Sequence, residues 1–424
     1  MYYMDFKFDR LCFSRSICFS ISILISLVFL SPIKAQVIEI EIGNIKELSE
    51  EYSLQWQQFE NRFNYMSYGE RAQVTPLNPS ISYDLEFLDN GSQSEYEQYL
   101  YLQKEIRTPG HFRNLRERRD ARIRLFDYQA DGDRHEWLAA TRLGFIRILL
   151  AQREVEILEN LKSRISRISD ASLRRAEAGE VSLLDDQLIQ MSNYQLQARI
   201  EERRIEADRL AMLWRNRMGF DEHAELYFKG EFESLNVVLP DNSELFQFLD
   251  RSPQSLALQQ AVDAAILEES IARSNRIPSF DLSAGYKQLN PNWRGFLFGI
   301  SIPLPILSSN SESISQARAL QGIEQANLDY AQSKRNQITF QLLGELDSYE
   351  YRLNQFPEYL NNKDPFLNRL LISYEEGTLS VSDFLNTLNL IADTFQTRFN
   401  QLTNYYGIAT ELEALTGQEF IIQN

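Results

Sequence analysis

The sequence contains two copies of one unit that is about 200 residues long. The segment Gly179-Glu180-Val181-Ser182 corresponds to Gly377-Thr378-Leu379-Ser380, and every residue of the second segment lies 198 positions after its counterpart. The same offset relates Met218-Gly219 to Thr416-Gly417. A period this long exceeds that of solenoid repeats and suits two copies of a supersecondary block. We therefore predict an internal tandem duplication, in which most of the chain is one block used twice.

In each copy the Gly-x-x-Ser segment lies between two stretches with a coiled-coil pattern. Glycine readily adopts the left-handed conformation that ends a helix, and serine can cap the start of the next helix. Apolar residues recur at spacings of three and four on both sides, which predicts packed helical seams. The predicted seam residues are Leu158, Leu161, Ile165 and Ile168; Val181, Leu184, Leu188, Met191, Gln195 and Ala198; and Val381, Phe384, Leu388, Ile391, Phe395, Arg398 and Leu402. Each copy is thus predicted to form a helical hairpin.

Four other segments alternate between apolar or aromatic and polar side chains, which is typical of β-strands with two different faces. They begin near Ile81, Tyr96, Phe280 and Phe296 and come as two pairs, one in each copy. Strands of this length and pattern suit a transmembrane β-barrel. Four strands cannot close such a barrel alone, and an open edge in lipid costs several kcal/mol for each unpaired group, so other subunits would have to complete it. The alternative is a soluble sandwich or two surface hairpins.

The remaining segments define the predicted domain organisation. Residues 37–75 are expected to be helical, and so is 114–178, with a bend at Asp131-Gly132-Asp133. The matching stretch 312–376 should break at Pro357 and Pro365. The predicted units are a signal peptide at 1–35, a first repeat at 36–219, a linker or equatorial region at 220–252, a second repeat at 253–417 and a short polar tail at 418–424.

The N-terminus has basic residues, the apolar run Ile17 to Leu30, and then Ala35, a pattern typical of a secretory signal. A membrane anchor is the alternative. Cys12 and Cys18 both lie in this segment, so the mature chain would have no cysteine, which excludes disulfides and thiolate chemistry. It would carry 39 Lys and Arg against 58 Asp and Glu, and this negative balance disfavours nucleic acid as a partner.

The sequence gives little support to an enzyme. His111, His135 and His223 lack metal-ligand spacing, and neither a Gly-rich phosphate loop nor a nucleophile triad can be identified. We therefore predict no catalysis and no cofactor. A periplasmic coiled-coil adaptor or scaffold would also have helical hairpins. Two pairs of amphipathic strands are unnecessary in such a protein, and they favour a membrane channel.

Several short motifs, taken together in their order, resemble the TolC family of outer-membrane efflux proteins over nearly the whole mature chain. The resemblance implies a mainly α protein, a homotrimer whose long hairpins form an α-barrel across the periplasm. Each protomer would add four strands to a twelve-stranded β-barrel in outer-membrane lipid of a Gram-negative bacterium. The implied function is the exit duct of a tripartite efflux pump, working with a periplasmic adaptor and an RND-type or ABC inner-membrane pump. A type I protein or peptide secretion channel is the alternative. The motifs are Ser252-Pro253-Gln254-Ser255-Leu256, Ala272 to Pro278, Ser301-Ile302-Pro303-Leu304 and Tyr374 to Ser380.

The resemblance also implies site residues. The adaptor-docking tips map onto Ala178, Gly179, Glu180, Val181 and Ser182, and onto Glu376, Gly377, Thr378, Leu379 and Ser380. The periplasmic aperture maps onto Tyr374, Asp383, Asn386 and Asp185, although Asn386 stands where an acidic residue is usual. A threefold ring of Asp383 carboxylates would bind or select cations. Asp383 could instead serve only the helix dipole in the first turn after Ser380, and Tyr374 could be seam packing.

Overall fold

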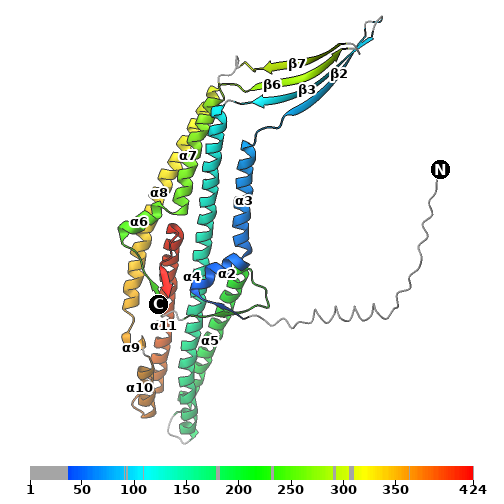
Figure 1. The fold of residues 1–424 in the computed structure, drawn as a ribbon. Coiled ribbons are helices and arrows are strands. Elements are labelled where there is room, and N and C mark those ends of the chain that lie inside the picture. The colour runs from blue at the N-terminus through cyan, green and yellow to red at the C-terminus, as the bar shows by residue number, and fades with distance from the viewer. Residues whose placement is uncertain are drawn as a thin grey trace, which may run out of the picture.

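The computed structural model describes residues 37–423 except 90, 92–93, 108, 178–181, 231–233, 290–292, 305–309 and 362, so the expected signal peptide lies outside the described residues. The protein is elongated, with a β-sheet at one end and long helices that run away from it (Figure 1). A belt of short strands lies about midway along the helices, near both ends of the described chain.

The two copies are visible as matching helices. Helix α5 (Leu183–Met218) and helix α11 (Val381–Thr416) have 36 residues each, and both of their ends are 198 residues apart. Each helix ends at a glycine in the left-handed conformation, with φ of 81° at Gly219 and 71° at Gly417. Glycine adopts this conformation without the steric cost of a Cβ atom.

The long incoming helices differ between the copies. Helix α4 (Pro109–Glu177) is continuous over 69 residues, so nothing interrupts it at Asp131-Gly132-Asp133, where the sequence suggested a bend. A lone glycine costs a helix only about 1 kcal/mol, and the packing of α3 (Leu54–Val74) and α7 (Pro253–Ser274) along α4 offsets that cost. The sequence predicted a break near Pro357 in the second copy, and this is confirmed. Helix α8 (Ser311–Asn354) is followed by α9 (Glu358–Asn361) and α10 (Lys363–Glu375), and Pro365 is the third residue of α10.

The four predicted strands are confirmed and form one antiparallel sheet. Its order is β2 (Ser80–Asp89), β3 (Ser94–Ile106), β6 (Phe280–Leu289) and β7 (Trp293–Ser301). The two copies meet at the central β3–β6 pair, where Tyr99 lies opposite Lys287. Strands β2 and β7 are the edges, and each pairs with one strand only among the described residues.

The belt near the middle corrects two expectations, for residues 37–75 and for the C-terminal tail, and it shows the local structure of the expected linker. Residues 37–75 do not begin as a helix, because β1 (Val37–Ile40) pairs in parallel with β4 (Glu225–Phe228) before the helical turn Ile42–Asn44 and α2 (Ile45–Tyr52). The region 220–252 contains β4, β5 (Leu235–Val237) and α6 (Asn242–Asp250). The C-terminal segment is not simply a polar tail, because β8 (Ile421–Gln423) pairs with β5, and Phe420 and Ile421 are buried. These pairings join residues far apart in sequence, which local periodicity does not reveal.

The predicted seams are confirmed on α4 and mostly on α11. Leu161 and Phe384 are each 1% exposed, but on α11 the buried residue is Phe399 and not Arg398. The predicted seam of α5 is wrong, because Leu184 and Met191 are 60% and 61% exposed. Two rows of α5 repeat at spacings of three and four, and packing on α4 selects the other one. The buried row is Asp186, Ile189, Ser192, Leu196 and Ile200.

Candidate channel surfaces: the amphipathic sheet and the hairpin tips

The sheet has one polar and one apolar face, and the register keeps the two apart. Successive side chains of a strand point to opposite faces, and directly paired residues point to the same face. Asp84 is paired with Tyr99, and Tyr99 with Lys287, in a row of polar groups that crosses three strands. The neighbouring row pairs Tyr83 with Leu100. A shift of one residue in the pairing would move every side chain of a strand to the opposite face. The two faces therefore stay distinct only in this register.

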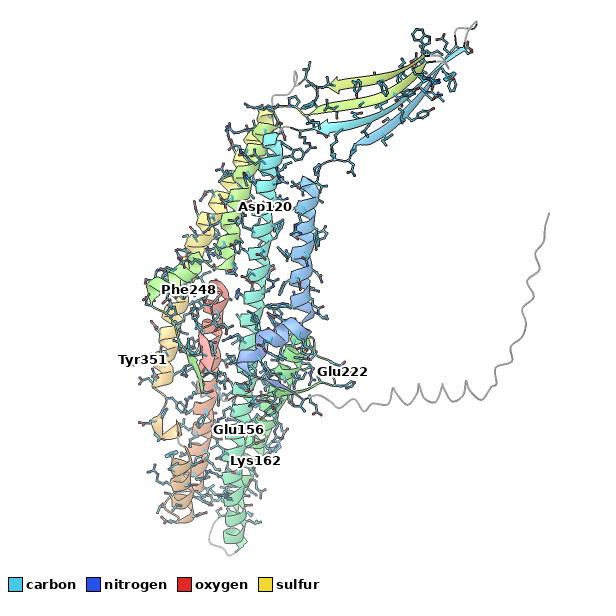
Figure 2. All side chains as sticks on the ribbon, in the orientation of Figure 1. Asp120, Glu156, Lys162, Glu222, Phe248 and Tyr351 are labelled. Carbon is cyan, nitrogen blue, oxygen red and sulfur yellow. The ribbon has the colours of Figure 1, made fainter. Side chains whose placement is uncertain are left out.

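The apolar face is uncovered in the protomer. Phe87, Phe296 and Phe298 are 75%, 81% and 79% exposed, and the side chains of the sheet project freely from it in Figure 2. Soluble monomers rarely expose large contiguous apolar patches, and such a patch usually marks a contact with protein or membrane. The apolar face comprises Ile81, Tyr83, Leu85, Phe87, Leu100, Leu102, Leu282, Ala284, Tyr286, Phe296, Phe298 and Ile300.

The polar face is predominantly acidic. Its single lysine, Lys287, lies with Nζ 2.8 Å from a carboxylate oxygen of Glu97 and 3.0 Å from the hydroxyl oxygen of Tyr99. Glu86 is paired with Glu97 across β2 and β3. The carboxylates of this face are those of Asp84, Glu86, Glu95, Glu97, Glu105 and Asp281. A wall of this charge attracts cations and repels anions.

The tip of the second hairpin has the geometry that the sequence predicted for the end of a helix. Gly377 has φ of 74°, and its N–H donates to the carbonyl of Tyr374 at 3.0 Å. The N–H of Thr378 donates to the carbonyl of Ser373 at 3.0 Å, and the two bonds together make a Schellman motif. Thr378 also donates its hydroxyl to the Ser373 carbonyl at 2.8 Å, so the exposed turn is held by its own backbone.

Ser380 begins α11 as an N-cap. Its Oγ accepts from the backbone N–H of Asp383 at 3.1 Å and donates to the Asp383 carboxylate at 2.7 Å. Asp383 therefore has a capping role in the protomer, beside the N-terminal end of the helix dipole. Asn386 is exposed one turn further along α11. Tyr374 is only 3% exposed and its ring centroid is 5.4 Å from that of Phe384, so within the protomer it packs in the seam.

The first tip is described only in part, because Ala178, Gly179, Glu180 and Val181 lie outside the described residues. Ser182 caps α5 by accepting from the backbone N–H of Leu184 at 3.2 Å, and Asp185 is half-buried in the first turn.

Sequence reasoning missed the buried neighbour of Asp185. Asp186 is 4% exposed, with one carboxylate oxygen 2.8 Å from Gln190 Nε2. Its burial had no signal in the sequence, since a carboxylate in the first turn of a helix is usually solvated.

Polar links between the two hairpins were also missed. Arg164 of α4 forms an ion pair with Asp364 at 2.8 Å and also donates to Asn368, both on α10. Arg199 of α5 reaches Asp393 of α11 at 2.8 Å. These contacts bring the second hairpin against the first, and the described start of α5 lies at the same end of the molecule as the turn between α10 and α11 (Figure 1). Long-range ion pairs of this kind leave no mark in local spacing.

Within the described ranges, no helix is both long enough and apolar enough to cross a membrane. The same part of the chain holds no group of three or more His, Cys, Asp or Glu side chains that could bind a metal ion.

Known proteins resemble this chain in sequence and in architecture. No protein-family model matches the chain. The cobalt-zinc-cadmium resistance protein CzcC of Cupriavidus metallidurans is 24% identical over 286 residues, which span 65% of this chain and 66% of CzcC. The similarity thus covers about two thirds of that relative's length.

Solved structures match over more of the chain. CusC superposes with a TM-score of 0.75 at 15% identity, over 90% of this chain and 92% of CusC. The outer membrane protein VceC of Vibrio cholerae gives a TM-score of 0.72 at 12% identity, over 89% and 96%. The CmeC outer membrane channel of Campylobacter jejuni gives 0.70 at 12% identity, over 89% and 86%. These likenesses confirm the resemblance seen in the sequence, and the chain has the fold of the TolC family of outer-membrane efflux proteins.

Proposed function

We propose that the protein is the outer-membrane exit duct of a tripartite efflux pump, conducting passively what an inner-membrane transporter expels through a periplasmic adaptor. The observation that carries this proposal is the sheet, whose apolar face is exposed and whose two edge strands each pair, among the described residues, on one side only. An exposed apolar face of this kind is unfavourable in water but suited to lipid, and unpaired edge strands are costly in lipid, so a single protomer would need partners there. No chemical step is assigned to the protein, which acts by its shape and charge.

Three protomers would complete the barrel. Strand β2 of one protomer would pair with β7 of the next, and three sets of four strands give twelve, with the acidic face inward and the apolar face in the lipid of a Gram-negative outer membrane. In this arrangement the repeats 36–219 and 253–417 each supply a strand pair and a helical hairpin. The segments 220–252 and 418–424 belong to the belt midway along the periplasmic helices.

The exposed row of α5 supports the same assembly. It repeats every seven residues and stays uncovered in the protomer, with Ile205 68% and Met212 54% exposed. Helix α5 lies at one side of the helical bundle, and α8 and α10 lie at the other (Figure 1). In a closed ring these sides would meet, so the row would pack against the neighbouring protomer. The row consists of Leu184, Met191, Ala198, Ile205 and Met212.

The hairpin tips are proposed to dock the adaptor, through residues 178–182 and 376–380. The first test replaces Gly377 with valine. A β-branched residue cannot easily hold φ of 74°, so the exposed turn must change shape, whereas the sheet and the seams are untouched. The matched control is Gly322→Val in α8, where glycine has ordinary helical dihedrals and an added Cβ meets no atom within 4 Å.

We expect Gly377→Val to weaken capture of the purified adaptor at least tenfold, while the trimer still forms, and Gly322→Val to leave both unchanged. Equal capture by both variants would contradict the tip assignment. Electron microscopy of the detergent-extracted protein tests the duct itself, since a threefold tube much longer than a bilayer is expected. A soluble monomer would refute the duct and favour a coiled-coil scaffold.

A divalent metal cation is the cargo we favour. The supporting observations are the similarity to CzcC, a cobalt-zinc-cadmium resistance protein, and the six carboxylates against one lysine on the polar face of the sheet. In planar bilayers we expect selectivity for cations, reduced in Glu86→Gln/Glu97→Gln. Asp383→Asn should raise conductance or weaken block by divalent cations if Asp383 lines the aperture. An unchanged current in this last variant would leave Asp383 with its capping role alone.

A further inference from the structure

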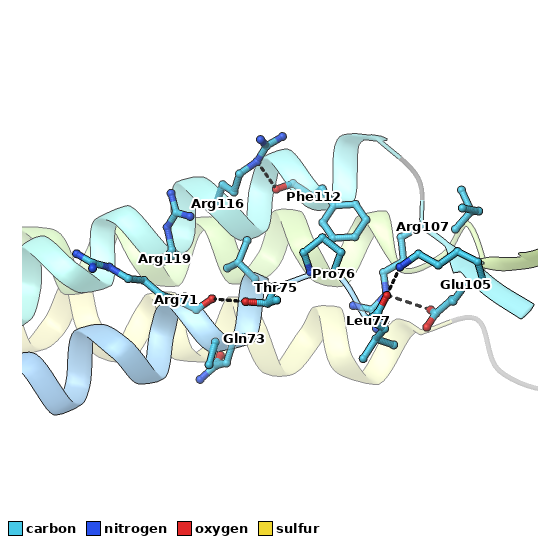
Figure 3. Close-up of a pocket in the computed structure, with 14 residues that line it drawn as sticks. Arg71, Gln73, Thr75, Pro76, Leu77, Glu105, Arg107, Phe112, Arg116 and Arg119 are labelled. Carbon is cyan, nitrogen blue, oxygen red and sulfur yellow. Dashed lines mark hydrogen bonds and ion pairs between the residues drawn. The ribbon is translucent and has the colours of Figure 1, made fainter. Parts of the chain in front are cut away.

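A cleft of about 940 Å³ lies where the sheet joins the helices. Its walls are the end of α3, the link from Thr75 to Leu77, the base of β3 and the first turns of α4 (Figure 3). If the sheet spans the outer membrane as proposed above, this junction lies at the level of the lipid headgroups of the periplasmic leaflet.

The cleft is strongly cationic in a chain of net charge −17. Five of its lining residues are basic and only Glu105 is acidic. Glu105 is already paired with Arg107 at 3.0 Å. The basic residues are Arg71, Lys104, Arg107, Arg116 and Arg119.

Three of these cations have no carboxylate within ion-pairing distance among the described residues. Lys104 donates to the backbone carbonyl of Leu77, Arg116 donates to that of Phe112 at 3.3 Å, and Arg71 lies over the ring of Tyr68 at 5.6 Å. Arg119 pairs with Asp120 at 2.7 Å. The positive charge of the cleft therefore exceeds the negative charge that the described residues provide.

Most of the remaining lining is apolar and leads toward the apolar face of the sheet. Val74, Pro76, Ile106 and Phe112 line the cleft between the basic groups. Lys104 also lines a second depression of about 520 Å³, on the apolar face, with Leu102, Leu282, Ala284, Phe298 and Ile300. A molecule with an anionic head and a long apolar tail fits this arrangement, in which a cationic cleft is followed by an apolar surface.

We propose that the cleft binds an anionic phospholipid of the periplasmic leaflet, with its phosphate held by Arg71 and Arg116 and an acyl chain on the apolar face beyond Lys104. Guanidinium groups bind phosphate through paired N–H donors, and basic side chains at a membrane boundary favour anionic lipid. The proposal rests on the proposed function, which places the sheet in the membrane. It makes this junction a fixed lipid site that anchors the duct at a defined depth.

The test uses the full-length protein in detergent, titrated with dioleoylphosphatidylglycerol and, separately, with dioleoylphosphatidylcholine and inorganic phosphate, and read by native mass spectrometry. The variant is Arg71→Gln/Arg116→Gln, since both residues are exposed and the change should not unfold the chain. The matched control is Arg113→Gln, an exposed arginine of the same first turns of α4 that does not line the cleft.

We expect phosphatidylglycerol to bind at least tenfold more tightly than phosphatidylcholine, and the double variant, but not Arg113→Gln, to lose that preference. Equal affinity for the two lipids, or equal loss in the control, would overturn the proposal. Complete displacement of phosphatidylglycerol by inorganic phosphate would also overturn it, in favour of a small-anion site. Conductance in planar bilayers is measured in parallel, so that a protein that forms channels without binding the lipid refutes the lipid site alone. A protein that forms none refutes the proposed function.

Discussion

The belt midway along the helices contains a buried ion pair whose loss should be measurable. Arg142 of α4 is 5% exposed, and its Nη2 atom is 3.4 Å from a carboxylate oxygen of Glu413 and 2.5 Å from the carbonyl oxygen of Ile421. The same Glu413 oxygen accepts from the backbone N–H groups of Phe420 and Ile421 at 2.7 and 2.8 Å. Arg142 also pairs with Glu419. This cluster holds β8 against α4 and α11.

Replacing Arg142 with methionine fills similar space but leaves the Glu413 carboxylate buried without its cation. Burial raises the pKa of Glu413, and Arg142 opposes that effect, so the pair is needed to keep the carboxylate charged. Breaking a buried pair on one side costs about 3–5 kcal/mol. In Arg142→Met/Glu413→Gln the amide oxygen still accepts from the two N–H groups and no charge is stranded. We expect the double variant to recover at least half of the loss.

The assay is unfolding in urea, followed by tryptophan emission. Three of the four tryptophans lie near this belt or on the helices around it, and Trp214 Nε1 donates to the carbonyl of Thr141, next to Arg142, at 3.0 Å. The control is Arg147→Met, an exposed arginine on the same helix. A loss below about 1 kcal/mol for Arg142→Met, or no recovery in the double variant, would refute the assigned role, because a stranded buried charge must cost more than that.

Three further results are expected. Gly285→Ala places a Cβ 2.5 Å from that of Tyr101, so β3 and β6 must separate at a cost of about 1–3 kcal/mol. The control is Gly295→Ala on β7, where the added Cβ meets no atom within 4 Å. If the urea midpoints of the two variants fell equally, the predicted clash at Gly285 would be wrong. Phe384→Ala, in the seam beside the tip, should cost about 3–5 kcal/mol in the same assay, and a much smaller loss would mean that the site collapses. Burial lowers the pKa of His111, so at acidic pH the imidazole is protonated more readily in the unfolded chain than in the folded one. The free energy of unfolding should therefore fall as the pH drops below about 6.5. In His111→Gln this part of the pH dependence should vanish.

The local features of this protein followed from the sequence because their causes are local. Gly377 and Ser380 stand where a helix must end and another must begin, and the structure has the left-handed turn and the N-cap there. The four strands alternate with a period of two, so their existence and their faces could be predicted. The continuity of α4 could not, because the packing of α3 and α7 along it decides whether Gly132 interrupts the helix.

The candidate site was predicted in part, for the same reason. The sequence indicated that Tyr374 and Asp383 belong near a tip, but only the structure brings Tyr374 against Phe384 and the Asp383 carboxylate against Ser380. The cationic cleft had no signal in the sequence, since Arg71 and Arg116 belong to different helices and line the same cleft only in the folded chain.

The duplication, the helical hairpins and the two-faced strands could all be predicted from the sequence. Each of these is read within a few residues or at a fixed offset, and each reflects backbone dihedrals and side-chain periodicity. Which face of α5 is buried depends on tertiary packing. Leu184 and Ile189 belong to two rows of similar spacing, and contact with α4 buries the row of Ile189. Tertiary packing also decided that the chain's last strand pairs with β5, because such a pairing depends on where two distant segments are brought together by the helices between them.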